Sequence, residues 1–186
     1  MQNSTPVFLW IDLEMTGLDL HVRNDQIIEL AVVLTDSHLE NIIKGPEIVI
    51  NAPNTLLDTM DEWNSKHHKE SGLYEQSLNS KISLQQAEEQ VLQFLKSNNV
   101  VQRQAYITGN SVHQDYRFLD KQMPKLIEFL HYRIIDVSTI KTLAQKWNPG
   151  LLADAPVKKN QHRALDDILE SIEELKYYKS SFFKIV

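Results

Sequence analysis

A short apolar run near the N-terminus, Val7 to Leu13, constrains the fold of this chain more than any other feature. It reads Val-Phe-Leu-Trp-Ile-Asp-Leu, and its aliphatic and aromatic residues are typical of a strand buried on both faces in the middle of a sheet. Asp12 lies inside this run and Glu14 directly follows it. Because side chains alternate along a strand, we expect both carboxylates to project from one face at the strand's C-terminal end.

Two buried acids on one face need a reason. Placing two negative charges side by side without a partner costs free energy or forces one of them to protonate. A divalent cation would remove that cost. The alternative is that the strand ends before Asp12, so that both acids are solvated loop residues. The pair therefore indicates a metal site only if further acids converge on it.

Composition limits the class of protein. With 186 residues, 42% of them hydrophobic, and only five Gly and six Pro, the chain suits a single domain over residues 1–186. It has no Cys, which excludes disulfides and thiolate metal sites. The N-terminus resembles no secretory signal, and no run approaches membrane-spanning length, so we expect a cytoplasmic protein. A net charge of -6 argues against long duplex nucleic acid as a partner but is compatible with a small anionic substrate held by metal ions.

Strand-like and helix-like segments alternate along the rest of the chain. The patterns predict strands at 26–35, 42–50, 105–108 and 132–137, and helices at 83–96, 112–122, 139–147 and 163–178, with short helices within 51–80. Gly45 and Pro46 interrupt the third strand, which predicts a bulged or edge strand there.

A third acid lies in the helix predicted from Val112. Ser111 followed by Gln114 is a capping-box pattern and predicts the helix start. At 100° per residue Asp115 falls in the middle of the apolar face, with Phe118 below it. A partner of the helix dipole is the alternative, but that role does not require the core-facing side. We therefore favour a functional role for Asp115.

The last helix carries two adjacent aspartates that helical phase separates. Asp166 shares its face with polar residues, whereas Asp167 borders the small residues Ala164 and Ser171, which permit close approach to the sheet. Asp167 is therefore the predicted inward acid. His162 precedes this helix and is expected in a loop or first turn. A His at a helix start is usually a surface residue, but this one stands beside a predicted metal site.

These residues carry a resemblance over nearly the whole chain. Asp12, Glu14, Asp115 and Asp167, with His162, resemble the DEDD exonuclease superfamily in its His-containing branch. The motifs Gly-Asn-Ser-x-x-Gln-Asp and His-Arg-Ala-Leu-Asp-Asp resemble the oligoribonuclease family in particular. The resemblance implies an α/β, ribonuclease H-like fold, with a five-stranded mixed sheet flanked by helices.

The resemblance also implies a chemistry. The four carboxylates would hold two Mg²⁺ or Mn²⁺ ions about 3.5–4 Å apart. His162 would act as general base toward the attacking water. The products would be nucleoside 5′-monophosphates, released from the 3′ end of very short RNA, with dinucleotides preferred.

Substrate contacts are implied by the same resemblance. Leu18 and Trp63 would contact bases, and a homodimer would let Tyr132 reach into the partner's site to stack on a base. The 5′ phosphate would be held by Ser111, His68, Arg133 and Ser138. These residues also have ordinary alternative roles. Leu18 and Trp63 could be core residues, Ser111 and Ser138 could be helix caps, and Arg133 could be a surface residue. Residues 158–161 read Lys-Lys-Asn-Gln, where the family pattern has a Gly, which bears on the mobility of that segment.

Two other functions stay open at the level of sequence. One is a DNA-directed 3′ to 5′ proofreading exonuclease using the same site. The other is a non-catalytic RNA-binding module. The presence of suitable residues at all five catalytic positions argues against it.

Overall fold

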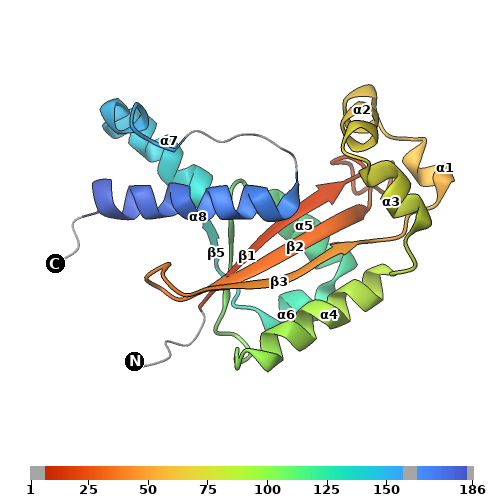
Figure 1. Ribbon diagram of the computed structural model, residues 1–186, viewed down its shortest axis with the longest axis horizontal. Helices are drawn as coiled ribbons and strands as arrows, with labels where there is room; N and C mark the ends of the chain where they lie inside the picture. The colour runs from red at the N-terminus through yellow and green to blue at the C-terminus, as the bar shows by residue number, and fades with distance from the viewer. Residues whose placement is uncertain (1–6, 157–162, 184–186) are drawn as a thin grey trace.

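The computed structural model describes residues 7–156 and 163–183. Within them, five strands form one mixed sheet in the order β3-β2-β1-β4-β5 (Figure 1). The strands are β1 (Phe8–Met15), β2 (Ile27–Thr35), β3 (Ile42–Val49), β4 (Tyr106–Gly109) and β5 (Ile134–Asp136). β1 pairs antiparallel with β2 and parallel with β4. The predicted fold class, a five-stranded mixed sheet flanked by helices, is confirmed.

The central strand β1 continues past both of its acids. It ends only at Met15, so the alternative that Asp12 and Glu14 lie in a loop is wrong. In the antiparallel register Asp12 faces Ala31 and Glu14 faces Glu29, with a shift directly after Glu14. The acids therefore occupy the last regular positions of the middle strand.

Helices cover both faces of the sheet. They are α1 (Asn54–Leu57), α2 (Glu62–Glu70), α3 (Leu73–Asn79), α4 (Leu84–Ser97), α5 (His113–Gln122), α6 (Pro124–Phe129), α7 (Val137–Trp147) and α8 (Ala164–Ser181), with a 3₁₀ turn η1 (Pro149–Leu152). Figure 1 shows α4 and α6 on one side of the sheet and α8 crossing the other. No helix in the described part of the chain is long and apolar enough to cross a membrane.

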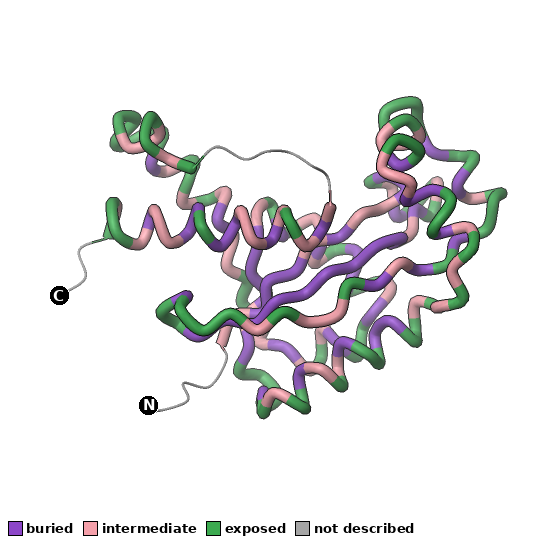
Figure 2. The backbone as a smooth tube through the Cα atoms, in the orientation of Figure 1, coloured by how far each residue is buried: buried purple, intermediate pink, exposed green. Residues whose placement is uncertain are grey.

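Alternation along β1 divides the core into two layers. Leu9, Ile11 and Leu13 pack with α4, α5 and α6, whereas Trp10 packs with α7 and α8. Both layers are buried, as the tube of Figure 2 shows along the central strands. Asp12 and Glu14 follow Trp10 in the alternation, so they point to the α8 side.

Two local predictions need correction. The capping box predicted at Ser111 and Gln114 is wrong, because Val112 precedes α5 without any side-chain cap. Ser111 instead has a positive φ of 51°, and its backbone N–H donates to residues outside α5. A capping box does form at α4, between Ser83 and Gln86. The fifth strand is also shorter than predicted, since Val137 already begins α7.

The bulge predicted near Gly45 is confirmed. The β2–β3 register shifts between Ala31 and Val33, and β3 lies at the sheet edge. A Cβ at Gly45 would come within 2.6 Å of the ring of Phe94 on α4 and within 2.7 Å of a methyl group of Val32, so a side chain there would require these neighbours to shift.

Candidate active site

Three acids from the two ends of the chain meet at the C-terminal end of β1. Asp12 and Glu14 come from the strand, and Asp167 comes from the first turn of α8. One carboxylate oxygen of each lies within 4.8 Å of the others. Asp166 is exposed and lies outside this group, whereas its neighbour Asp167 belongs to it.

Asp115, from α5, is the fourth predicted acid and is not part of this group of three. Its side chain is buried, and its Oδ1 accepts a hydrogen bond of 3.1 Å from the backbone N–H of Leu13. Burial and then the charge of Asp12 raise the pKa of Asp115 well above its usual range. A buried carboxylate that is destabilised as an anion by its neighbours is a candidate for a functional site.

The electrostatics of Glu14 favour a bound cation. Burial, followed by the charges of Asp12, Glu29 and Asp167, raises the pKa of Glu14 to about 8, and Arg163 opposes this shift. Carboxylate oxygens are hard ligands of the kind that Mg²⁺ and Mn²⁺ prefer. The donor set therefore fits a divalent cation, which would neutralise the repulsion.

The repulsion among these carboxylates predicts that the free energy of unfolding of the metal-free protein depends on pH. Because Glu14 has a higher pKa folded, about 8, than its ordinary 4.5, the folded state binds the proton more tightly than the unfolded state. Stability should fall as pH rises between these values, by up to about 1.4 kcal/mol per pH unit. Urea denaturation in EDTA at several pH values measures this, and Mn²⁺ should reverse the loss. Glu14→Gln should make the slope shallower, with the remainder due to Asp115, and the exposed control Glu40→Gln should leave it unchanged; equal slopes in both variants would contradict the prediction.

Ser111 and Ser138 are brought together beside α7. The Ser111 backbone N–H donates to Asp136 Oδ1 at 2.9 Å and to Ser138 Oγ at 3.0 Å, and the two hydroxyls lie 3.2 Å apart. An open cavity of about 390 Å³ lies here, lined by Ser111, His113, Asp136, Ser138, Thr139, Thr142 and Leu143. His68 and Arg133 are not among its lining residues.

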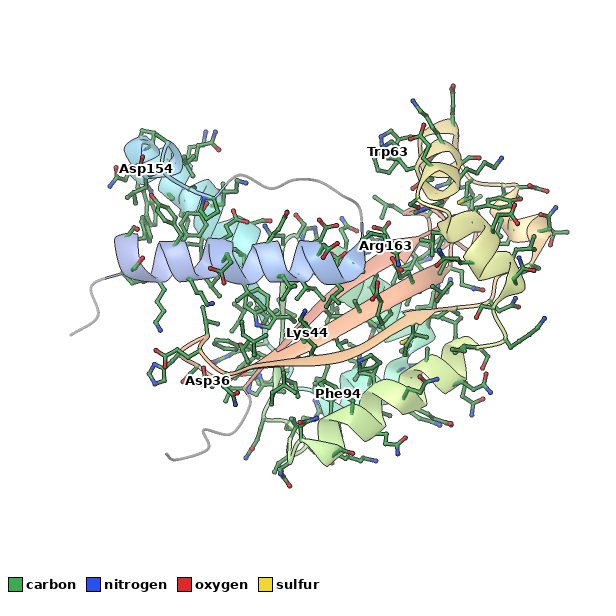
Figure 3. The ribbon with its side chains drawn as sticks, viewed as in Figure 1. Asp36, Lys44, Trp63, Phe94, Asp154 and Arg163 are labelled. Carbon is green, nitrogen blue, oxygen red and sulfur yellow. The ribbon has the colours of Figure 1, made fainter. Side chains whose placement is uncertain are left out.

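The other predicted substrate contacts are distributed around the sheet's end. Leu18 is 55% and Trp63 59% exposed, so their alternative role as core residues is wrong. Figure 3 shows Trp63 projecting from α2 on the side of the sheet that α8 covers, and its ring stacks on His67 at a centroid distance of 3.9 Å. His68 is buried and its Nε2 is hydrogen-bonded to the Met15 carbonyl at 2.9 Å.

Tyr132 stands out from the surface just before β5. Its ring is 68% exposed and stacks on His131 at 4.6 Å, while the Arg133 guanidinium lies 5.4 Å from its centroid. An exposed aromatic side chain held by its neighbours is available for contact with another molecule. His162 lies outside the described residues, so its predicted role stays a prediction.

Sequence reasoning missed two acids near these sites. Glu29 lies fully buried opposite Glu14, and a lone charge within the apolar run of β2 was the available signal. Asp136 is the N-cap of α7 and accepts from the Ser138 backbone N–H, and an Asp directly before a helix was the available signal for that bond. Its second bond, from the Ser111 backbone N–H, comes from a distant segment that no short motif indicates.

Comparison with known proteins agrees with this geometry. The family model described as Exonuclease matches residues 9–175. The human mitochondrial oligoribonuclease is 49% identical over 95% of this chain and 73% of its own length. An oligoribonuclease of Chromobacterium violaceum is 44% identical over the full length of both chains.

Solved structures with low identity share the fold. Cell-death related nuclease 4 superposes with a TM-score of 0.71 at 17% identity, covering 94% of this chain and 64% of that chain. Pop2p of S. pombe, solved in its Mg²⁺ and Mn²⁺ bound form, gives 0.67 at 16% identity, covering 96% and 84%. With acids converging at the end of β1 and full-length oligoribonuclease relatives, the chain belongs to the exonuclease family as an oligoribonuclease-like 3′ to 5′ exoribonuclease.

Proposed function

We propose that this chain degrades very short RNAs, dinucleotides above all, to nucleoside 5′-monophosphates with the help of two Mg²⁺ or Mn²⁺ ions. The observation that carries the proposal is the convergence of Asp12, Glu14 and Asp167 within 4.8 Å, with Asp115 buried beside them. The oligoribonuclease relatives supply the substrate class.

The four carboxylates would hold the cations, and His162 would accept the proton of the attacking water. When bound, such ions polarise water and neutralise the charge of the phosphodiester. The imidazole suits the proton transfer because it titrates near neutral pH. Leu18 and Trp63, both exposed, would contact the bases.

The preference for short RNA would come from the pocket beside α7. The hydroxyls of Ser111 and Ser138, 3.2 Å apart, are suited to donate to a 5′ phosphate, and the exposed Arg133 would add charge. His68, whose Nε2 is hydrogen-bonded to the Met15 carbonyl, would be a further contact of the 5′ phosphate. Because the chain carries a net charge of -6, little else would hold a long backbone. A longer RNA would lose the phosphate contacts without replacing them.

We further propose a cytoplasmic homodimer in which Tyr132 stacks on a base in the partner's site. Its exposed ring, fixed between His131 and Arg133, supports this role. Base stacking on an aromatic side chain is worth about 1–3 kcal/mol, so Tyr132→Ala should weaken dinucleotide binding by roughly 5-fold to 150-fold. Sedimentation that found a fully active monomer would contradict it.

Digestion of 5′-labelled RNAs of graded length tests the substrate preference. With Mg²⁺, the wild-type protein should degrade a 5′-phosphorylated dinucleotide faster than a seven-residue RNA, and Arg133→Ala should erase this preference by removing a phosphate contact. The exposed Arg103→Ala is the matched control and should keep it. Equal rates for a dinucleotide and a ten-residue RNA would remove the basis for the proposal, and equal degradation of single-stranded DNA would favour the DNA-directed alternative.

A further inference from the structure

One acid beside the carboxylate cluster is absent from the metal-ligating group. Glu29 is the single charged residue of β2, its side chain is 0% exposed, and it is the Cα partner of Glu14. Yet the cluster that could hold an ion, among the described residues, comprises Asp12, Glu14 and Asp167. Burying a carboxylate costs free energy unless the group is paired or hydrogen-bonded. The contacts of Glu29 should therefore indicate its role.

The contacts of Glu29 lead to the start of α8. Its Oε1 accepts a hydrogen bond of 3.1 Å from the Arg163 guanidinium, and the nearby backbone N–H of Ala164 lowers the pKa of this carboxylate. Its Oε2 is buried and has no hydrogen-bond partner in the described part of the chain. Of its two oxygens, Oε1 is therefore the one that faces the N-terminal end of α8.

The Glu29 carboxylate lies at the start of α8, where a helix cap is otherwise missing. Arg163 occupies the N-cap position of α8 in an extended conformation, φ -122°, and provides no side-chain cap. The first amides of a helix have no partner within it, and a carboxylate there satisfies one of them and complements the helix dipole. Here the capping carboxylate comes from β2, so it ties the helix start to the sheet.

The tie acts directly on the turn that carries a metal-ligating acid. The Asp167 backbone N–H donates to the Arg163 carbonyl at 3.0 Å, which makes Asp167 part of the turn that begins at the capped residue. Arg163 also reaches Glu47 on β3 at 3.2 Å, and Figure 3 shows it at the end of α8 nearest the strands. Moving Arg163 would therefore move Asp167 relative to β1.

We propose that Glu29 is a positioning residue, which with Arg163 fixes the first turn of α8 so that Asp167 meets Asp12 and Glu14. This inference rests on the proposed metal-dependent function. Glu29 itself binds neither metal nor RNA. It sets the separation between the acids of β1 and the acid of α8, on which the geometry of ion binding depends.

The isosteric variant Glu29→Gln tests this role. It keeps the shape of the side chain but loses the charge that holds Arg163, so Mn²⁺ binding measured by calorimetry should weaken roughly 10-fold to 100-fold, the usual effect of losing a residue that orients metal ligands. The kcat for a dinucleotide should fall while KM stays unchanged. Glu47→Gln removes the partly exposed partner of Arg163 without touching Ala164, and should bind Mn²⁺ like the wild type.

A double variant separates positioning from simple stabilisation. Replacing a buried ion pair with apolar side chains often preserves stability, so Glu29→Leu combined with Arg163→Met should melt near the wild-type temperature. Its Mn²⁺ affinity should nevertheless stay low, because the start of α8 has lost the carboxylate that faces it from β2. A double variant that bound Mn²⁺ as tightly as the wild-type protein would overturn the inference. Wild-type Mn²⁺ affinity in Glu29→Gln would overturn it as well. Failure of the wild-type protein to bind Mn²⁺ or release mononucleotides would instead overturn the proposed function.

Discussion

Alanine at any one of Asp12, Glu14, Asp115 or Asp167 should reduce mononucleotide release by more than about 100-fold, beyond the usual effect of losing a supporting residue outside the ligand set. The reason is that each carboxylate supplies a ligand oxygen and a negative charge that no neighbour replaces. Mononucleotide release from a labelled dinucleotide with Mg²⁺ measures the loss.

The same variants should remain folded. Three of these acids lie close enough to repel one another, so removing one should maintain or raise the melting temperature in EDTA. Asp166→Asn is the matched control, because Asp166 is exposed one residue away from Asp167. If Asp166→Asn inactivated the protein as fully as Asp167→Asn, the assignment of the inward acid would be wrong.

His162→Ala should lower kcat by roughly 10²–10⁴-fold, the range for losing a general base. Mn²⁺ affinity should barely change, because the proposed ligands are all carboxylates. Single-turnover hydrolysis and calorimetry measure the two quantities separately. The exposed His38, in the turn between β2 and β3, provides the control His38→Ala. Clearly weaker Mn²⁺ binding in His162→Ala would make this histidine a metal ligand.

Sequence predicted the parts of the fold and site that depend on periodicity within one element. The alternation of β1 placed Asp12 and Glu14 on one face, and the phase of α8 separated Asp167 from Asp166. These are local properties, because a strand or helix fixes the relative directions of its own side chains.

Contacts between distant segments were not predictable in this way. The cap of α8 comes from Glu29, 134 residues from Arg163, so no local capping motif exists to be found. The false capping box at Ser111 has the same origin, since the Ser111 backbone N–H bonds to Asp136 at the end of β5 and to Ser138 in the first turn of α7. Local propensity cannot weigh such a competing partner.

The order of the strands and helices along the chain affects when the active site can form during synthesis. Antiparallel β1, β2 and β3 are neighbours in sequence and can pair early, whereas α8 is the last described element to leave the ribosome. Until it docks, a nascent chain carries Asp12 and Glu14 without Asp167. This long-range contact can form only after every element from β1 to α8 has been synthesised. Chains that lack α8 should therefore be unable to cleave RNA, and nuclease activity should appear only after α8 has been synthesised.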